Sequence, residues 1–205
     1  MRKPILIIAA TAMLIMGCGP RVRVPPKVML TEIGTVGLVR FESNSEGNFE
    51  DYVTEEFLAE IREDQPAARI VELGRERDLL AEIGAERMNP SALDSLGKAY
   101  SLSAVITGRL HIGEPEADVS LWGGLENLSV SREVTARLSV KIRETTEGAT
   151  IWSGSADKTR EIDGISLHGG NIHLDADNPD RAYGKLVDAL IKEIVEDFKF
   201  TWERE

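Results

Sequence analysis

Residues 128–143 read LSVSREVTARLSVKIR, and this stretch decides the fold. Apolar side chains occupy its even positions, with Arg132 as the one exception, and polar side chains occupy its odd positions. An alternation with a period of two predicts a β-strand that has one buried face and one face in water. Residues 146–149 then predict a turn, because Gly148 readily adopts a positive φ. The next run, residues 150–158, is the predicted hairpin partner.

Three shorter apolar runs predict the remaining strands of the same sheet. They are rich in β-branched side chains and are bounded by turn residues, as central strands usually are. They cover residues 35–41, 68–73 and 104–112, and Gly74 closes the second of them.

Helices are predicted between and after these strands. Residues 49–64 have an apolar side chain every fourth residue, with Asn48 as the expected cap. Residues 75–83 predict a short helix, and Asn89-Pro90 and Asn178-Pro179 each predict a helix start. The last helix carries an apolar stripe formed by Tyr183, Val187, Leu190, Ile191, Ile194 and Phe198.

Together these elements predict the order β-α-β-α-α-β-β-β-α. Helices that alternate with strands and are followed by a hairpin favour an α/β fold. We therefore expect a single sandwich with a mixed β-sheet and a C-terminal hairpin plus helix, formed by residues 28–205. The sequence contains no internal repeat and no sign of a second domain.

The amino-terminal segment has the layout of a secretory signal peptide. Arg2 and Lys3 are followed by the uncharged apolar residues 5–16 and then by Gly17 and Cys18. The apolar stretch is shorter than the about 20 residues that cross a bilayer. We therefore expect residues 1–17 to be a leader that is removed.

The end of this leader resembles the lipobox of bacterial lipoproteins, with Leu14, Ile15, Met16 and Gly17 before Cys18. The resemblance implies that the Cys18 thiol receives a diacylglycerol, that cleavage precedes Cys18, and that the new amino terminus is acylated. It also accounts for a secreted chain with a single cysteine. Gly19 follows, and by the same resemblance the absence of Asp there favours the periplasmic face of the outer membrane over the inner membrane.

Residues 18–27 are predicted to be a short tether. Pro20, Pro25 and Pro26 favour an extended, polyproline-like backbone at about 3.1 Å per residue. The folded domain should therefore lie close to the membrane surface.

The charge balance excludes one class of partner. The chain has a net charge of −11, from 24 Lys and Arg against 35 Asp and Glu. Because an acidic chain repels phosphate backbones, no nucleic-acid partner is expected. The same repulsion means that attachment to a membrane must come from the acyl chains on Cys18.

Several segments together resemble a family of envelope lipoproteins. They are residues 34–41, 70–73 and 96–108, and the hairpin 141–155 with Glu147-Gly148 at its turn. This series is similar to the curli-secretion-channel and penicillin-binding-protein-activator lipoproteins (CsgG/LpoB type), whose domain is like the N-terminal domain of TolB. The resemblance implies that fold and no enzymatic activity or cofactor.

The expected function is that of a lipid-anchored periplasmic accessory protein that docks protein partners of the cell envelope, with self-association left open. Two alternatives come from the resemblance. One is a subunit of a CsgG-like outer-membrane secretion channel, although only residues 128–142 alternate over the length a membrane strand needs. The other is an activator of a peptidoglycan synthase, although the tether is short for a protein that reaches through peptidoglycan.

Two further candidate sites have weaker patterns. His168, His173 and Asp175 lie in a loop predicted over residues 162–177, and imidazole with carboxylate suits divalent metals. Their spacing matches no strong motif, so no metal is expected. Leu121, Trp122 and Leu125 form an apolar tip between two strands, which either contacts a partner or a membrane or folds back over the sheet.

No catalytic residue is predicted. Ser153, Ser155 and Ser166 have no Gly-x-Ser-x-Gly elbow around them and no assignable base.

Overall fold

The computed structural model describes residues 21–45, 49–114, 116–121, 128–161, 166–168, 171–173 and 184–204. The elements in chain order are β1 (Arg21–Val24), α2 (Leu30–Ile33), β2 (Thr35–Arg40), β3 (Glu42–Ser43), α3 (Phe49–Asp64), β4 (Arg69–Arg75), α4 (Glu76–Glu82), α5 (Pro90–Tyr100), β5 (Ala104–Ile112), β6 (Glu116–Leu121), β7 (Leu128–Glu144), β8 (Thr150–Glu161), β9 (Ser166–His168), β10 (Asn171–His173), α6 (Lys185–Val195), the 3₁₀ helix η2 (Glu196–Phe198) and β11 (Thr201–Arg204).

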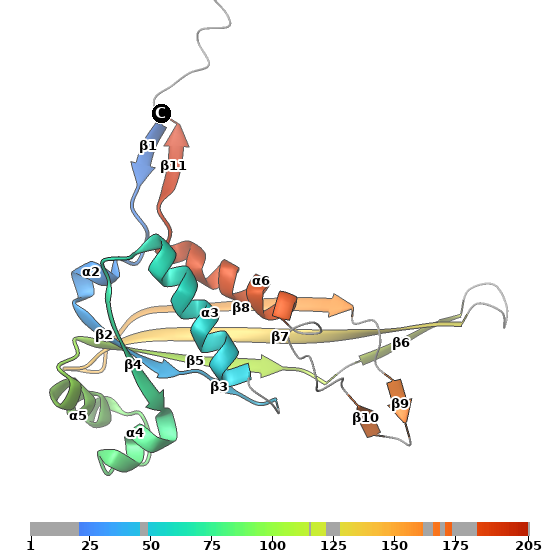
Figure 1. Ribbon diagram of the computed structural model, residues 1–205, viewed down its shortest axis with the longest axis horizontal. Coiled ribbons are helices and arrows are strands. Elements are labelled where there is room, and N and C mark those ends of the chain that lie inside the picture. Colours follow the sequence, from blue (N-terminus) through green and yellow to red (C-terminus); the bar gives the residue numbers. More distant parts are fainter. Residues whose placement is uncertain are drawn as a thin grey trace, which may run out of the picture.

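Seven strands form one mixed sheet, which confirms the expected α/β class. Its order is β4-β2-β5-β7-β6, with β3 beside β5 and β8 beside β7. Strand β2 runs parallel to β4 and β5, whereas β7 runs antiparallel to β5, β6 and β8. Because β6 pairs with residues 128–133 of β7 and β5 pairs with residues 136–144, β6 continues the line of β5. The β6–β7 pair extends away from the body of the molecule (Figure 1).

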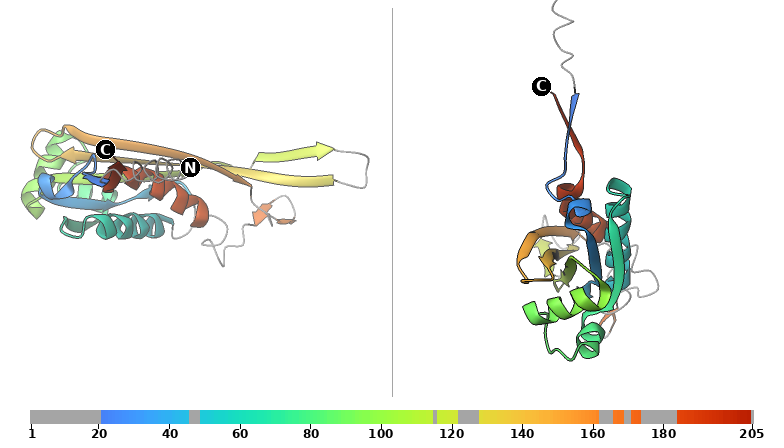
Figure 2. Two further views of the ribbon diagram at one scale, coloured as in Figure 1. Left: turned by 90° about the horizontal axis from the view of Figure 1, so that it is seen from above. Right: turned by 90° about the vertical axis from the view of Figure 1, so that its left-hand side faces the viewer.

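The main core lies between the sheet and the helices α3 and α6, which cover the same face (Figure 2). The even positions of β7 from Val134 to Ile142 are all buried, as the alternation predicts. They meet the predicted apolar stripes of the two helices, including Phe57 of α3 and Leu190 of α6. Burial of one such face stabilises the sheet by about 25 cal/mol for each Å² of apolar surface removed from water.

A row of aromatic rings runs through this core. Phe41 and Phe57 have ring centroids 5.1 Å apart, Phe57 and Phe198 6.1 Å, and Phe198 and Trp152 4.9 Å. The last two pairs meet edge to face, a favourable geometry for aromatic quadrupoles. The row joins the end of β2 to α3, η2 and β8.

A second, smaller cluster covers part of the opposite face of the sheet. Leu80 of α4 and Leu93 and Leu96 of α5 pack there on Val39 and Val105. Asn89 caps α5 by accepting a hydrogen bond from the Ala92 amide at 2.9 Å, and Pro90 is its first residue, as predicted. Apolar clusters therefore lie on both faces of the sheet where β2, β4 and the first half of β5 run.

The structure corrects the prediction at several places. Residues 21–24 of the expected tether form β1, which pairs antiparallel with β11, a strand the sequence did not predict. Gly74 lies inside β4 rather than closing it. The loop predicted over residues 162–177 contains the paired strands β9 and β10. The caps predicted at Asn48 and Asn178-Pro179, and Tyr183 of the last stripe, lie outside the described residues.

Candidate functional site: an open groove on the sheet

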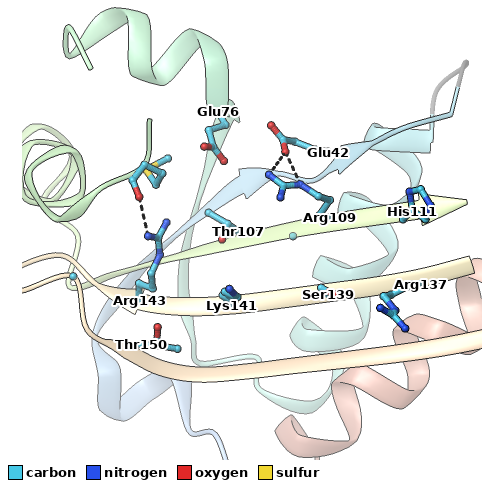
Figure 3. Close-up of a pocket in the computed structure, with 13 residues that line it drawn as sticks. Glu42, Glu76, Thr107, Arg109, His111, Arg137, Ser139, Lys141, Arg143 and Thr150 are labelled. Carbon is cyan, nitrogen blue, oxygen red and sulfur yellow. Dashed lines mark hydrogen bonds and ion pairs between the residues drawn. The ribbon is translucent and has the colours of Figure 1, made fainter. Parts of the chain in front are cut away.

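A groove of about 650 Å³ lies on the face of the sheet that α4 and α5 leave uncovered. Its floor consists of the odd positions of β5 and β7, and its rim includes Glu42 of β3 and Glu76 of α4 (Figure 3). We call this the open-face groove. Its polar lining residues are Glu42, Glu76, Thr107, Arg109, His111, Arg137, Ser139, Lys141, Arg143 and Thr150.

Strand register brings these side chains together. Thr107 lies opposite Lys141, Arg109 opposite Ser139, and His111 opposite Arg137. Residues directly opposite each other in an antiparallel pair share a face, and residues two apart along a strand return to it. The even positions of β7 are in the core, so the odd positions must face away from it. The groove is thus the wet face that the alternation of residues 128–143 predicts.

Two of the groove's arginines are held by carboxylates. Arg109 donates through Nε and Nη2 to Oε2 of Glu42, at 3.0 and 2.7 Å. The hydrogen bond to Glu42 raises the pKa of Arg109 above its ordinary value, so the guanidinium stays charged. Arg137 donates to Asp157 of β8 at 2.5 Å. These two pairs are largely exposed and contribute at most about 1 kcal/mol each.

The other two cations of the groove are not neutralised within the described part of the chain. Lys141 is exposed, and none of the described carboxylates lies within ion-pair distance of its ammonium. Arg143 donates from Nη1 to the Met88 carbonyl at 2.8 Å. Its Nε is buried without a hydrogen-bond partner among the described residues. A buried donor without a partner costs about 1–3 kcal/mol. The accessible cation that the groove offers to an acceptor is therefore Lys141.

The charged form of Glu76, at the rim of the groove, is unfavourable in the folded protein. Burial raises the pKa of its carboxyl group above the ordinary value, and the neighbouring Glu42 raises it further, while Arg109 and Arg143 oppose the rise. The cations of the groove therefore compensate Glu76 only in part.

This arrangement is suited to binding rather than to bond cleavage. It offers ammonium and guanidinium donors, which pair with carboxylate or phosphate oxygens through charge-assisted hydrogen bonds. His111 is exposed on its strand and lies opposite Arg137. Within the described ranges no set of three His, Cys, Asp or Glu side chains is arranged to hold a metal ion.

The sequence-predicted sites lie elsewhere. The lipobox residues, Cys18, Trp122, Leu125 and Asp175 are outside the described residues, and only the backbone position of Leu121 is described, at the end of β6. His168 and His173 lie on β9 and β10 but are not cross-strand partners, since His168 pairs with Asn171 and His173 with Ser166. The open-face groove was missed, although the basic odd positions Arg137, Lys141 and Arg143 were visible in the sequence.

In the portion of the chain that the structure covers, no helix combines the length and the apolar character needed to span a membrane.

Comparison with known proteins adds structural matches only. No family model matches the chain, and no curated protein sequence matches it. Among solved structures, the PelC dodecamer from Paraburkholderia phytofirmans is 13% identical over 89% of this chain and 99% of that chain, with a TM-score of 0.43. The hypothetical protein CT253 from Chlamydia trachomatis is 14% identical over 80% and 96%, with a TM-score of 0.48. The LpoB C-terminal domain from Escherichia coli is 13% identical over 65% and 95%, with a TM-score of 0.35.

The expected resemblance to the curli-secretion-channel and penicillin-binding-protein-activator lipoproteins stays a prediction.

Proposed function

We propose that this chain is a lipid-anchored accessory protein of the bacterial envelope, held at a membrane by acyl groups on Cys18. Its folded domain docks an acidic segment of an envelope protein in the open-face groove. The observation that carries the docking role is that Lys141, exposed on the uncovered sheet face, has no ion-pair partner among the described residues.

Charge complementarity selects the occupant. A chain of net charge −11 repels acidic partners over most of its surface, so a local concentration of donors marks where an acidic segment is favoured. Carboxylates of that segment would pair with the exposed ammonium of Lys141. Tethering both proteins to the envelope raises their effective concentration, so the groove itself needs only modest affinity.

Anchoring is tested by replacing the acylated residue. Cys18→Ser should move the protein from the membrane fraction to the soluble fraction, and mass spectrometry of the wild-type amino-terminal peptide should show the acyl groups. A C18S protein that stays membrane-bound in full contradicts the anchor.

Docking is tested by crosslinking in the native envelope followed by mass spectrometry. Lys141→Glu should abolish the crosslinked partner. Lys185→Glu is the matched control, because it makes the same charge change at an exposed position of α6, on the helix-covered face. The size of the assembly in detergent separates the channel alternative, which requires a large symmetric ring.

A further inference from the structure

The strands β1 and β11 form a separate two-stranded ribbon that projects from the body of the molecule (Figures 1 and 2). We call it the terminal ribbon. At its base the Val28 amide donates to the Asp197 carbonyl at 3.0 Å, and Lys27 pairs with the Asp197 carboxylate at 2.7 Å. The ribbon therefore leaves the domain from a fixed point at the end of η2.

The terminal ribbon buries almost nothing. Arg21, Val22, Arg23, Trp202 and Glu203 are all exposed. A two-stranded ribbon without a packed face is marginally stable in water. The described part of the chain supports it with one contact, in which the Arg23 guanidinium lies 3.6 Å from the centroid of the Phe200 ring. A second surface that contacts the ribbon would explain its presence.

The exposed apolar groups of the molecule are concentrated on this ribbon. Among the described residues, the exposed large hydrophobic side chains are Val22, Val71, Ile151 and Trp202, and two of these belong to the ribbon. Trp202 is the most exposed of them, at 63%, and Val22 is at 42%. Tryptophan with one apolar and one polar edge is the side chain that favours the boundary between lipid and water.

One face of the ribbon combines this tryptophan with positive charge. Trp202 lies opposite Arg23 in the register, and Arg21 lies two residues from Arg23 on the same face. Across β1 and β11 the basic residues Arg21, Arg23 and Arg204 outnumber the single acid, Glu203. Arginines near an anionic lipid surface are attracted to its headgroups. The ribbon is thus a locally basic element on an acidic protein.

The short distance along the chain between the terminal ribbon and Cys18 indicates that the surface it contacts is the membrane. Arg21 follows Cys18 by three residues, and three residues span at most about 10 Å even when fully extended. If Cys18 carries acyl chains in a bilayer, the tip of the ribbon must lie within the headgroup layer or directly against it.

We infer that the terminal ribbon is a membrane-interface element, in which Trp202 enters the boundary of an anionic bilayer and Arg21 and Arg23, on the same face of the ribbon, contact its headgroups. This inference rests on the proposed acylation of Cys18. It adds a consequence, since a ribbon that enters the interface orients the domain instead of leaving it on a free tether.

The insertion is tested with the mature, acylated chain in vesicles of phosphatidylethanolamine and phosphatidylglycerol that carry brominated acyl chains, which quench tryptophan on contact. Quenching of the wild-type protein should be largely lost in Trp202→Phe and retained in Trp122→Phe. Quenching that persists in W202F, or that disappears in W122F, overturns the inference.

The charge contribution is tested with Arg21→Gln, which leaves the contact between Arg23 and Phe200 in place. It should reduce Trp202 quenching in the anionic vesicles and leave it unchanged in phosphatidylcholine vesicles, whereas Arg77→Gln on α4 should change neither. Equal quenching by R21Q and wild type in the anionic vesicles overturns the headgroup role. Acylation of Cys18 is measured separately by mass spectrometry. A chain without acyl groups contradicts the proposed anchoring. An acylated chain in which Trp202 is not quenched contradicts only the membrane-interface role of the terminal ribbon.

Discussion

The indole Nε1 of Trp152 donates to Oδ2 of Asp197 at 3.1 Å. Lys27 donates to the other oxygen of the same carboxylate at 2.7 Å. One side chain of η2 thereby joins β8 to the segment that leads from the terminal ribbon into the domain. The hydrogen bond from Lys27, and then that from Trp152, lower the pKa of Asp197 below its ordinary value.

This lowered pKa predicts the pH dependence of an Asp197→Asn variant. A carboxyl group whose pKa is lowered on folding adds stability above its unfolded pKa, and this stability is lost as the pH falls through the folded value. D197N should therefore be less stable than wild type at neutral pH, by about 1 kcal/mol. The difference should shrink as the pH falls below the ordinary value of 3.8 and vanish only below the lowered pKa of the folded state. Urea unfolding at neutral pH and at about pH 3 measures this. Asp94→Asn, which removes an exposed helix pair, is the control and should cost less.

Glu76→Gln should show the opposite pH dependence. Because burial raises the pKa of Glu76, the folded state favours its protonated form, and the stability from this preference is lost as the pH rises through the folded pKa. E76Q should therefore be more stable than wild type at neutral pH and equal to it in acid below the ordinary value of 4.5. Thermal unfolding across this range checks the prediction. A destabilised E76Q at neutral pH would show that Glu76 is held by a favourable partner.

The buried side-chain amide of Gln65, just after α3, hydrogen-bonds the segment before α2 and the end of η2. Its Oε1 accepts from the Leu30 amide at 2.9 Å, and its Nε2 donates to the carbonyls of Val28 and Phe198 at 2.7 and 2.9 Å. Gln65→Leu leaves three buried backbone groups without partners, so we expect a loss of about 3 kcal/mol in unfolding free energy. A loss below about 1 kcal/mol would mean that water replaces the amide.

Two strand glycines provide a matched test of packing. A Cβ added at Gly108 would lie 2.5 Å from the Phe41 ring, whereas one added at Gly74 would meet nothing within 4 Å. Gly108→Ala should therefore destabilise the fold by about 1–3 kcal/mol. Gly74→Ala should be neutral or slightly stabilising, because alanine lowers the entropy of the unfolded chain. Equal stability of the two variants would contradict the close packing of β5 on Phe41.

The sequence predicted those elements whose signal is local. The alternation in residues 128–143 and the apolar spacing in residues 49–64 correspond to β7 and α3, because each pattern depends only on the period of its own element. The Arg-Val-Arg-Val of β1 alternates over only four residues, which is too short to predict a strand, and β11 has no clear alternation. The partner of each strand lies far away in the sequence, so no local pattern could reveal their pairing. The prolines around residues 21–24 indicated an extended backbone correctly but could not show that it is paired.

The open-face groove could be predicted only in part. The wet face of β7 follows from its alternation, and its basic residues were visible. The position of Glu42 and Glu76 at the rim depends on how β3 and α4 lie beside β5, which no local pattern contains. Likewise, the extent of uncovered sheet depends on where α4 and α5 stop, because only packing determines which strands two short helices cover.

The central claim is that an envelope protein docks in the open-face groove, and site-specific photo-crosslinking in cells tests it most directly. Ser155 is exposed on β8 and pairs with Ser139 on the groove floor, whereas Glu55 is exposed on α3, on the helix-covered face. A photoreactive residue at position 155 should give a discrete protein adduct that Lys141→Glu removes and Lys185→Glu leaves in place, and position 55 should give none. An adduct at position 155 that survives K141E, or one that forms only at position 55, would contradict docking through the groove.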